Sequence, residues 1–243
     1  ERVMRFLLNA YFVWDETPLT NAHRLLAGCY LKIKDGKSEL VRYWDSIPGR
    51  DQLDLSEAEA LDRCEELIDD SCRIAMRSDV PYGVFLSGGV DSALVLDFCR
   101  AYDRDVATFS VGMGETDFDE SPKAAEVSKF LGIRNHEVYR LDEKGLLENL
   151  DRFYASLDEP HGDPGYVNAL FLSRSCRPNI TVALAGDGGD ELFAGYLPFK
   201  GLKHVPKLSW LPGFVPKTTR AAAASLLPGK DGYVSLQFKL MAY

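Results

Sequence analysis

The feature that most constrains the fold is a regular alternation of apolar runs and amphipathic segments between residues 56 and 185. Four runs have the length and bounding turns of buried strands, at residues 83–87, 106–111, 135–141 and 180–185. Helical spacing of apolar residues predicts helices over 56–77, 91–102, 121–131, part of 143–157, and 166–175. Strands that alternate with helices favour a parallel sheet with helices on both faces. The sequence therefore predicts an α/β domain.

The segments that flank this domain have different patterns. Residues 1–45 are strand-like, and two alternating runs surround the pair Asp35-Gly36, which favours a hairpin turn. We expect residues 47–55, with Pro48-Gly49 and several charges, to form a linker. Repeated prolines after Tyr196 predict an irregular region, in which a short alanine run is compatible with one helix.

Composition excludes several kinds of protein. With 46% hydrophobic and 27% charged residues, the chain is an ordinary globular one, and no run approaches the ~18 apolar residues of a membrane helix. A net charge of -9 with scattered Lys and Arg argues against a nucleic-acid partner. The 5 cysteines include no CxxC pair, which favours reduced, mostly buried thiols over disulfides or zinc. Since Glu1 opens no signal peptide, we expect a cytoplasmic protein.

A glycine-rich loop between the first of these strands and the helix after it carries the strongest functional signal: Ser87-Gly88-Gly89-Val90-Asp91-Ser92. Gly88 and Gly89 permit a sharp turn and close approach to a ligand, and the N–H groups at a helix start favour an anion. Because Asp91 would repel a phosphate, its carboxylate implies a bridging cation such as Mg²⁺. The spacing is neither GxxxxGK[ST] nor GxGxxG. The alternative is a tight strand-to-helix turn in which Asp91 only caps the helix.

These six residues resemble the PP-loop, SGGxDS, of the ATP pyrophosphatases. Segments 78–84, 109–121 and 185–196 narrow the resemblance to the glutamine-hydrolysing asparagine synthetase family, over about residues 25–200. The resemblance implies an adenine nucleotide alpha hydrolase-like fold, with ATP and Mg²⁺ as cofactors. It further implies that the β-carboxylate of aspartate is adenylated with release of pyrophosphate, and that ammonia then attacks the adenylate to give asparagine.

The same resemblance implies roles for individual residues in the two glycine-rich segments. The second segment follows the fourth strand, and open α/β sheets bind ligands at this carboxyl edge. The implied metal ligands are Asp91 and Asp190, and the implied catalytic residues are Asp187 and Glu191. The implied ATP-binding residues are Leu86, Ser87, Gly88, Gly89, Val90, Asp91, Ser92, Val111, Ala185 and Gly186. The alternative for Asp190 and Glu191 is a helix N-terminus, which favours acidic residues.

Three further features stay open at this level. Residues 158–160 and 163–164 resemble segments near the acceptor pocket in one branch of the family, or they form a polar loop with turn prolines. Lys123 and His136 are single residues of types that more often lie at the surface or in packing positions than in catalytic sites.

The resemblance also divides the chain. Residues 1–46 resemble the end of an N-terminal-nucleophile glutaminase domain, 56–200 the PP-loop synthetase domain, and 201–243 the start of an incomplete helical region. The chain is thus expected to be truncated at both ends, with the catalytic Lys and acceptor pocket beyond Tyr243. Cys29 is not placed as a nucleophile, so glutamine hydrolysis is not expected and ammonia would come from a glutaminase domain.

Two other functions fit the same residues. One is an amidotransferase that acts on a different carboxylate, such as a sugar acid or a β-lactam precursor. The other is a nucleotide-binding subunit that is inactive without a partner. In each case ATP is the expected ligand, no nucleic acid or membrane is expected, and a homodimer is compatible with the sequence.

Overall fold

A computed structural model describes residues 1–45, 53–114, 119–163, 165–196 and 199. Most of the expected linker and the whole expected C-terminal region, 201–243, lie outside the described residues. The chain divides into two units. The first comprises residues 1–46, 159–162 and 193–243, and the second comprises 47–158 and 163–192.

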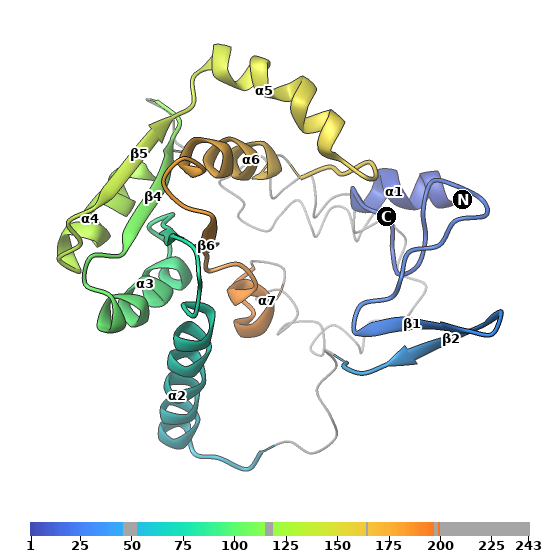
Figure 1. Cartoon of the computed structure of the whole chain (residues 1–243), viewed down its shortest axis with the longest axis horizontal. Coiled ribbons are helices and arrows are strands. Elements are labelled where there is room, and N and C mark those ends of the chain that lie inside the picture. Colours follow the sequence, from blue (N-terminus) through green and yellow to red (C-terminus); the bar gives the residue numbers. More distant parts are fainter. Residues whose placement is uncertain (46–52, 115–118, 164, 197–198, 200–243) are drawn as a thin grey trace, which may run out of the picture. The chain divides into compact units, whose positions relative to one another are not determined.

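The second unit is built around a four-stranded parallel sheet with the order β5-β4-β3-β6 (Figure 1). The strands are β3 (Tyr82–Phe85), β4 (Ala107–Gly112), β5 (His136–Arg140) and β6 (Val182–Leu184). All four predicted strands are therefore present, with ends shifted by one or two residues. Their shared direction brings the carboxyl ends of β4, β3 and β6 side by side at one edge.

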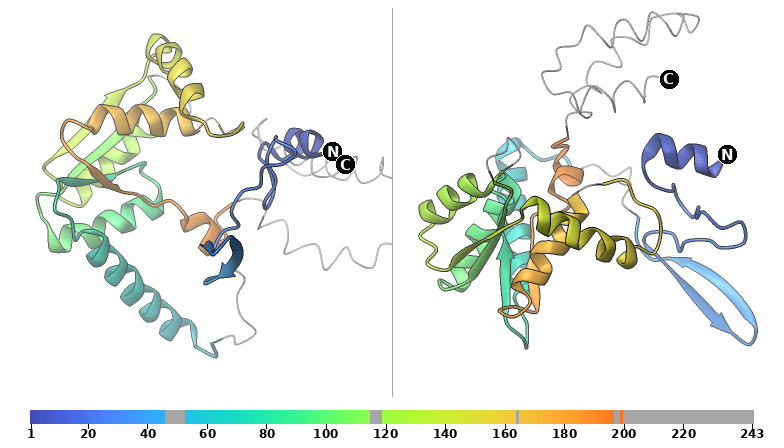
Figure 2. Two further views of the ribbon diagram at one scale, coloured as in Figure 1. Left: turned by 45° about the vertical axis from the view of Figure 1, so that its right-hand side comes forward. Right: turned by 90° about the horizontal axis from the view of Figure 1, so that it is seen from above.

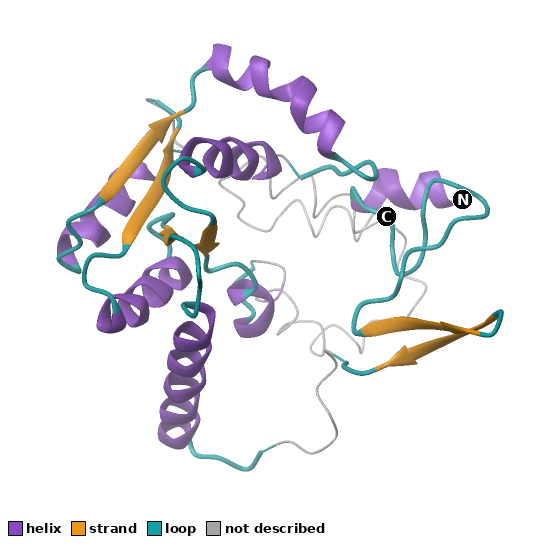
Figure 3. Cartoon of the chain, viewed as in Figure 1, coloured by secondary structure: helices purple, strands orange, loops and turns teal. Residues whose placement is uncertain are grey.

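Helices cover both faces of this sheet (Figures 2 and 3). The helices after the hairpin are α2 (Glu57–Ala75), α3 (Val90–Tyr102), α4 (Ser121–Phe130), α5 (Glu143–Ser156), α6 (Gly165–Cys176) and α7 (Gly189–Phe193). In Figure 2, α3 and α4 lie on one face and α6 on the other, as right-handed crossovers require. The predicted α/β class is confirmed. None of the described helices has the length and apolar character that crossing a membrane demands.

Local signals explain where two of these helices begin. Ser56 accepts a hydrogen bond from the Glu59 N–H, and the Glu59 carboxylate accepts one from the Ser56 N–H, so α2 starts with a capping box. Glu120 occupies the N-cap position of α4, and Ser121 is the first helical residue, as the predicted start at residue 121 requires. Asp119 accepts from the Ser121 N–H at 2.9 Å, so the capping carboxylate comes from earlier in the chain.

The core of this unit lies on both faces of the sheet. One cluster combines Val84, Leu86 and Val106 with helix residues that include Leu96 and Cys99. The other consists of Phe109, Leu172, Cys176 and Ile180. All five cysteines are free thiols and four of them are buried, as expected for reduced packing residues. Burial raises the pKa of Cys99 to about 12, so this thiol is protonated at neutral pH.

Ser110 links the two central strands from inside the core. Its side chain is 1% exposed, and its hydroxyl donates to the carbonyl oxygen of Leu86, just after β3. Ser110→Ala should therefore lower the free energy of unfolding by about 1–3 kcal/mol, because a buried carbonyl loses its hydrogen-bond partner. Urea unfolding measures the loss. Ser173→Ala, on the exposed side of α6, should change stability by less than about 0.5 kcal/mol, and equal losses would contradict the assignment.

His136 is held in its neutral form at the amino end of β5. Thr108 donates its hydroxyl proton to the Asn135 carbonyl at 3.3 Å, and Nδ1 of His136 lies 2.8 Å from the same hydroxyl oxygen. Within the described residues Nε2 is buried without a hydrogen-bond partner. Burial lowers the pKa of His136 below its usual 6.5.

Stability should consequently fall as the pH drops below about 6.5. The unfolded chain binds the His136 proton at a higher pH than the folded chain does, so acid favours unfolding until the pH passes below the folded-state pKa. Above the unfolded-state pKa this stability is fully present. His136→Gln should flatten that part of the profile. Urea unfolding between about pH 7.5 and 5 tests this, and identical slopes for wild type and variant would refute it.

The first unit contains a hairpin of β1 (Cys29–Lys34) and β2 (Lys37–Arg42), which pair antiparallel. Asp35 and Gly36 join the strands with φ values of 51° and 72°, the geometry of a two-residue type I′ turn. The predicted hairpin is confirmed. The strand-like prediction for residues 1–45 is wrong at its start, where α1 (Arg2–Asn9) is helical. Phe6 stacks on Phe12 across the end of that helix, a contact that strand alternation does not reveal.

Candidate functional site

The loop after β3 is braced by its own two serines. The Ser87 and Ser92 hydroxyl oxygens lie 3.0 Å apart, and the Ser92 hydroxyl also donates to the Gly89 carbonyl at 3.2 Å. The Gly89 N–H donates to the Ser87 hydroxyl oxygen, and Gly88 has a φ of +80° that favours glycine. The resemblance implies that Ser87 and Ser92 bind ATP. In the structure their hydroxyls hold the turn that opens α3.

The second glycine-rich loop, residues 186–189, lies directly against the first. A Cβ atom added at Gly186 would stand 2.6 Å from the Ser92 nitrogen, and one added at Gly189 would stand 2.5 Å from Cγ of Asp91. No real side chain tolerates such distances, so glycine is what allows this contact. Because β6 is the neighbour of β3 in the sheet, the two loops meet at its carboxyl edge. Both predicted glycine-rich segments therefore belong to one site, with Asp91 between them.

The acidic residues gather at the same place. Asp190 is half-buried, whereas Asp187 and Glu191 are exposed, and all three follow β6 around the start of α7. The contact of Gly189 with Asp91 sets two carboxylate residues, Asp91 and Asp190, on adjoining segments. Within the described residues no group of three or more His, Cys, Asp or Glu side chains is arranged for a metal ion. Mg²⁺ needs fewer, since one or two carboxylates with phosphate oxygens and waters complete its shell.

The residues implied for adenine lie at the ends of three neighbouring strands. Leu86 follows β3, Val111 is in β4 and Ala185 follows β6, and the strand register keeps them at similar heights. Leu86 is only 2% exposed, its N–H donates to the Phe109 carbonyl and its carbonyl accepts from Ser110, so it lines this edge from the core. Val111 and Ala185 are half-buried. A flat ring placed at this edge would meet backbone groups and apolar side chains.

Sequence reasoning missed two residues that the fold brings to the loops. Ser110 holds the Leu86 carbonyl from β4. Lys123 lies against the turn, because a Cβ atom at Gly88 would be 2.7 Å from Cβ of Lys123. Only the packing of α4 beside the loop reveals this contact, and no local pattern signals it. His136 is half-buried at the opposite edge of the sheet, as expected for a packing position.

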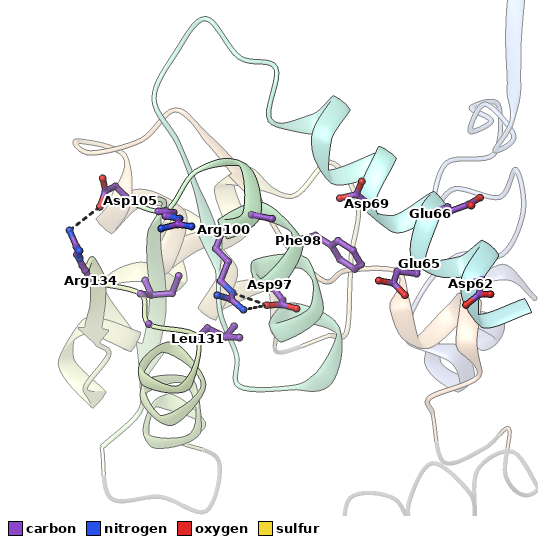
Figure 4. Close-up of a pocket in the computed structure, with 14 residues that line it drawn as sticks. Asp62, Glu65, Glu66, Asp69, Asp97, Phe98, Arg100, Asp105, Leu131 and Arg134 are labelled. Carbon is purple, nitrogen blue, oxygen red and sulfur yellow. Dashed lines mark hydrogen bonds and ion pairs between the residues drawn. The ribbon is translucent and has the colours of Figure 1, made fainter. Parts of the chain in front are cut away.

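Two cavities among the described residues lie away from this site. The larger, about 1190 Å³, is lined from α2, α3 and the segments that precede β4 and β5 (Figure 4). Its charged walls include the ion pairs Arg100–Asp97 and Arg134–Asp105. The smaller, about 570 Å³, contains His136 and also lies at the amino edge. Size alone would point to these cavities, but parallel sheets bind ligands at the carboxyl edge, where the glycine loops are.

Residues 158–164, part of which resemble segments near the acceptor pocket, divide between the two units. Asp158 belongs to the second unit, whereas residues 159–162 belong to the first. There Glu159 pairs with Arg24, and the Gly162 N–H donates to the Ala10 carbonyl at 2.9 Å. These contacts give the segment a packing role within its own unit.

A parallel α/β sheet with two glycine-rich loops joined at its carboxyl edge defines the class of α/β domains that bind ligands at that edge. The sequence model of one family, asparagine synthase, matches residues 63–238. The chain belongs to the asparagine synthase family.

Parts of this chain are similar to two curated proteins and to one solved structure. Asparagine synthetase [glutamine-hydrolyzing] 1 of Bacillus subtilis is 34% identical over 167 residues, which are 69% of this chain and 26% of the relative. Amidase chyE of Penicillium rubens is 29% identical over 232 residues, 87% of this chain and 34% of the relative. A solved NH3-dependent NAD synthetase from Campylobacter jejuni has 17% identity and a TM-score of 0.39, over 56% of this chain and 60% of that one. The chain thus spans about a quarter to a third of the length of these curated relatives.

Proposed function

We propose that this chain binds ATP across the two glycine-rich loops and supplies the adenylating half of an asparagine synthetase. The observation that carries the proposal is the contact of both loops through Asp91, made by Gly186 and Gly189. It places N–H groups, the start of α3 and two carboxylates at one edge of the sheet. A phosphate chain that carries a divalent cation matches this combination of groups.

In the proposed reaction the β-carboxylate of aspartate attacks the α-phosphorus of ATP, pyrophosphate leaves, and ammonia displaces AMP to form the amide. The loop N–H groups between Ser87 and Ser92 would stabilise the charge that moves onto pyrophosphate. Asp91 and Asp190 would hold Mg²⁺, which neutralises phosphate charge and improves the leaving group. Asp187 and Glu191, both exposed beside the loops, would orient the acceptor and the attacking amine.

The domain assignment is part of the same proposal. Residues 1–46 would be the end of a glutaminase domain, 47–55 a linker, 56–200 the synthetase domain and 201–243 the start of a helical region. Cytoplasmic location, a homodimer and ammonia delivered from a glutaminase domain are likewise proposed from family resemblance.

A second candidate is amide formation on a different carboxylate. It is supported by the similarity to amidase chyE, a relative that is not named as an asparagine synthetase. Both candidates use the same nucleotide chemistry, and they differ only in the acceptor.

Calorimetric titration of the full chain with ATP, with and without Mg²⁺, tests the proposal. We expect binding that requires the metal. Pyrophosphate release measured with aspartate, and then with other carboxylates, separates the two candidates. Absence of binding by a well-folded sample would refute the nucleotide site.

A further inference from the structure

A lysine from a neighbouring helix lies against the turn of the first loop. Gly88 is at the tip of the turn, and a Cβ atom there would stand 2.7 Å from Cβ of Lys123 and 2.7 Å from the backbone nitrogen of Ala124. The first turn of α4 is therefore in van der Waals contact with the loop backbone. The Lys123 side chain starts at this contact, and the residue is exposed.

The electrostatic position of Lys123 is unusual for a helix. It lies in the first turn of α4, where the helix dipole disfavours a positive charge, and that turn contains no acidic residue. The nearest preceding carboxylate is that of Glu120, the N-cap residue. The one before it, Asp119, accepts from the Ser121 hydroxyl and N–H, which hold the pKa of Asp119 below its usual range. Among the described residues Lys123 has no ion-pair partner. Its ammonium is available to an anion bound at the loop.

The first loop also lacks a cation of its own. Ser87-Gly88-Gly89-Val90-Asp91-Ser92 contains one acidic residue and no Lys or Arg, unlike a P-loop, whose lysine reaches the phosphates. A flexible lysine stem with a compact ammonium suits phosphate oxygens as a point charge. The fold supplies such a residue from α4, at the turn whose backbone faces the proposed ligand.

We propose that Lys123 binds the pyrophosphate part of ATP and so adds to the affinity for the β- and γ-phosphates. This rests on the proposed function, since it assigns a further residue to the same nucleotide site. The structural alternative is that the aliphatic stem of Lys123 only covers Gly88, and that its charge has no role.

The test compares Lys123→Met with Lys123→Arg and with Lys129→Met, which removes a lysine from the last turn of the same helix. The full chain is titrated calorimetrically with Mg²⁺ and either ATP, pyrophosphate or AMP. We expect Lys123→Met to weaken ATP and pyrophosphate at least about tenfold and to leave AMP unchanged. Lys123→Arg should retain most of the affinity, and Lys129→Met all of it.

Several outcomes would overturn the inference. Wild-type affinity for ATP in Lys123→Met would show that the charge has no role. Equal weakening of ATP and AMP would show that the stem only supports the loop. If wild type binds ATP in an Asp91-dependent manner while Lys123→Met is unaffected, the inference fails and the proposed function stands. If wild type binds neither ATP nor pyrophosphate, the proposed function fails and the inference with it.

Discussion

Replacing Asp91 with Asn should weaken Mg²⁺-dependent ATP binding by at least about a hundredfold and abolish pyrophosphate release. The substitution keeps the shape of the side chain, which matters because Asp91 is packed against Gly189. It removes the charge that would hold the cation. Calorimetric titration with ATP at fixed Mg²⁺, together with a pyrophosphate assay, measures both effects.

The direction in which Asp91→Asn changes the affinity for ATP without Mg²⁺ makes this prediction more specific. If Asp91 acts through a cation, its carboxylate repels the bare phosphates, so Asp91→Asn should bind metal-free ATP at least as tightly as wild type does. Asp97→Asn is the matched control, because it also removes an acidic residue of α3, one that pairs with Arg100. It should leave binding unchanged. Equal loss of affinity in the presence and absence of Mg²⁺ would instead indicate that Asp91 only supports the contact between the two loops.

Gly88→Ala should damage both stability and nucleotide binding, and Gly132→Ala separates the two causes. Both glycines have positive φ, +80° and +71°, so alanine at either position should lose about 1–2 kcal/mol of stability from backbone strain. Only Gly88 is also crowded, with Lys123 and Ala124 atoms 2.7 Å from the new Cβ, whereas Gly132 has no atom within 4 Å. Gly88→Ala should therefore lose a further ~1–3 kcal/mol from overpacking.

ATP binding should also be affected more by Gly88→Ala than by Gly132→Ala. The turn at Gly88 must move away from α4 to accept the methyl group, which displaces the N–H groups proposed to face pyrophosphate. We expect Gly88→Ala to lose measurable ATP binding at ligand concentrations that saturate wild type, and Gly132→Ala to bind normally. Urea unfolding and calorimetry on the same samples distinguish strain from crowding. Equal stability losses in the two variants would mean that the contact with α4 carries no cost.

Periodicity predicted most of the second unit because its elements carry complete local signals. The strands are continuous apolar runs, Ser56 and Glu59 form the capping box of α2, and the glycines mark the loops. Parallel strand direction then puts both loops at one edge without any knowledge of side-chain contacts. This is why the convergence of residues 87–92 and 186–189 could be expected from the sequence.

What could not be predicted depends on contacts between elements that are distant in the chain. The helix α1 is stabilised by the stacking of Phe6 on Phe12, and a hydrogen bond from the Gly162 N–H reaches the Ala10 carbonyl that follows it. In the sequence Ser110 is an ordinary strand residue, and only the structure shows that its hydroxyl donates to the Leu86 carbonyl. In the sequence Lys123 is an ordinary surface residue, and only the structure shows that its helix, α4, packs against Gly88. Such roles arise only when the sheet order is known.

The contact of Gly186 and Gly189 with Asp91 and Ser92 also limits how this domain can be recombined with its relatives. A chimera with a crossover anywhere between residues 92 and 186 takes its two loops from different parents. If the second parent carries even an alanine at the Gly186 position, its methyl group collides with the backbone of the first loop, and at the Gly189 position it displaces the Asp91 carboxylate. Transferring both loops from the same parent avoids this collision, so chimeric proteins should keep the two loops as a pair.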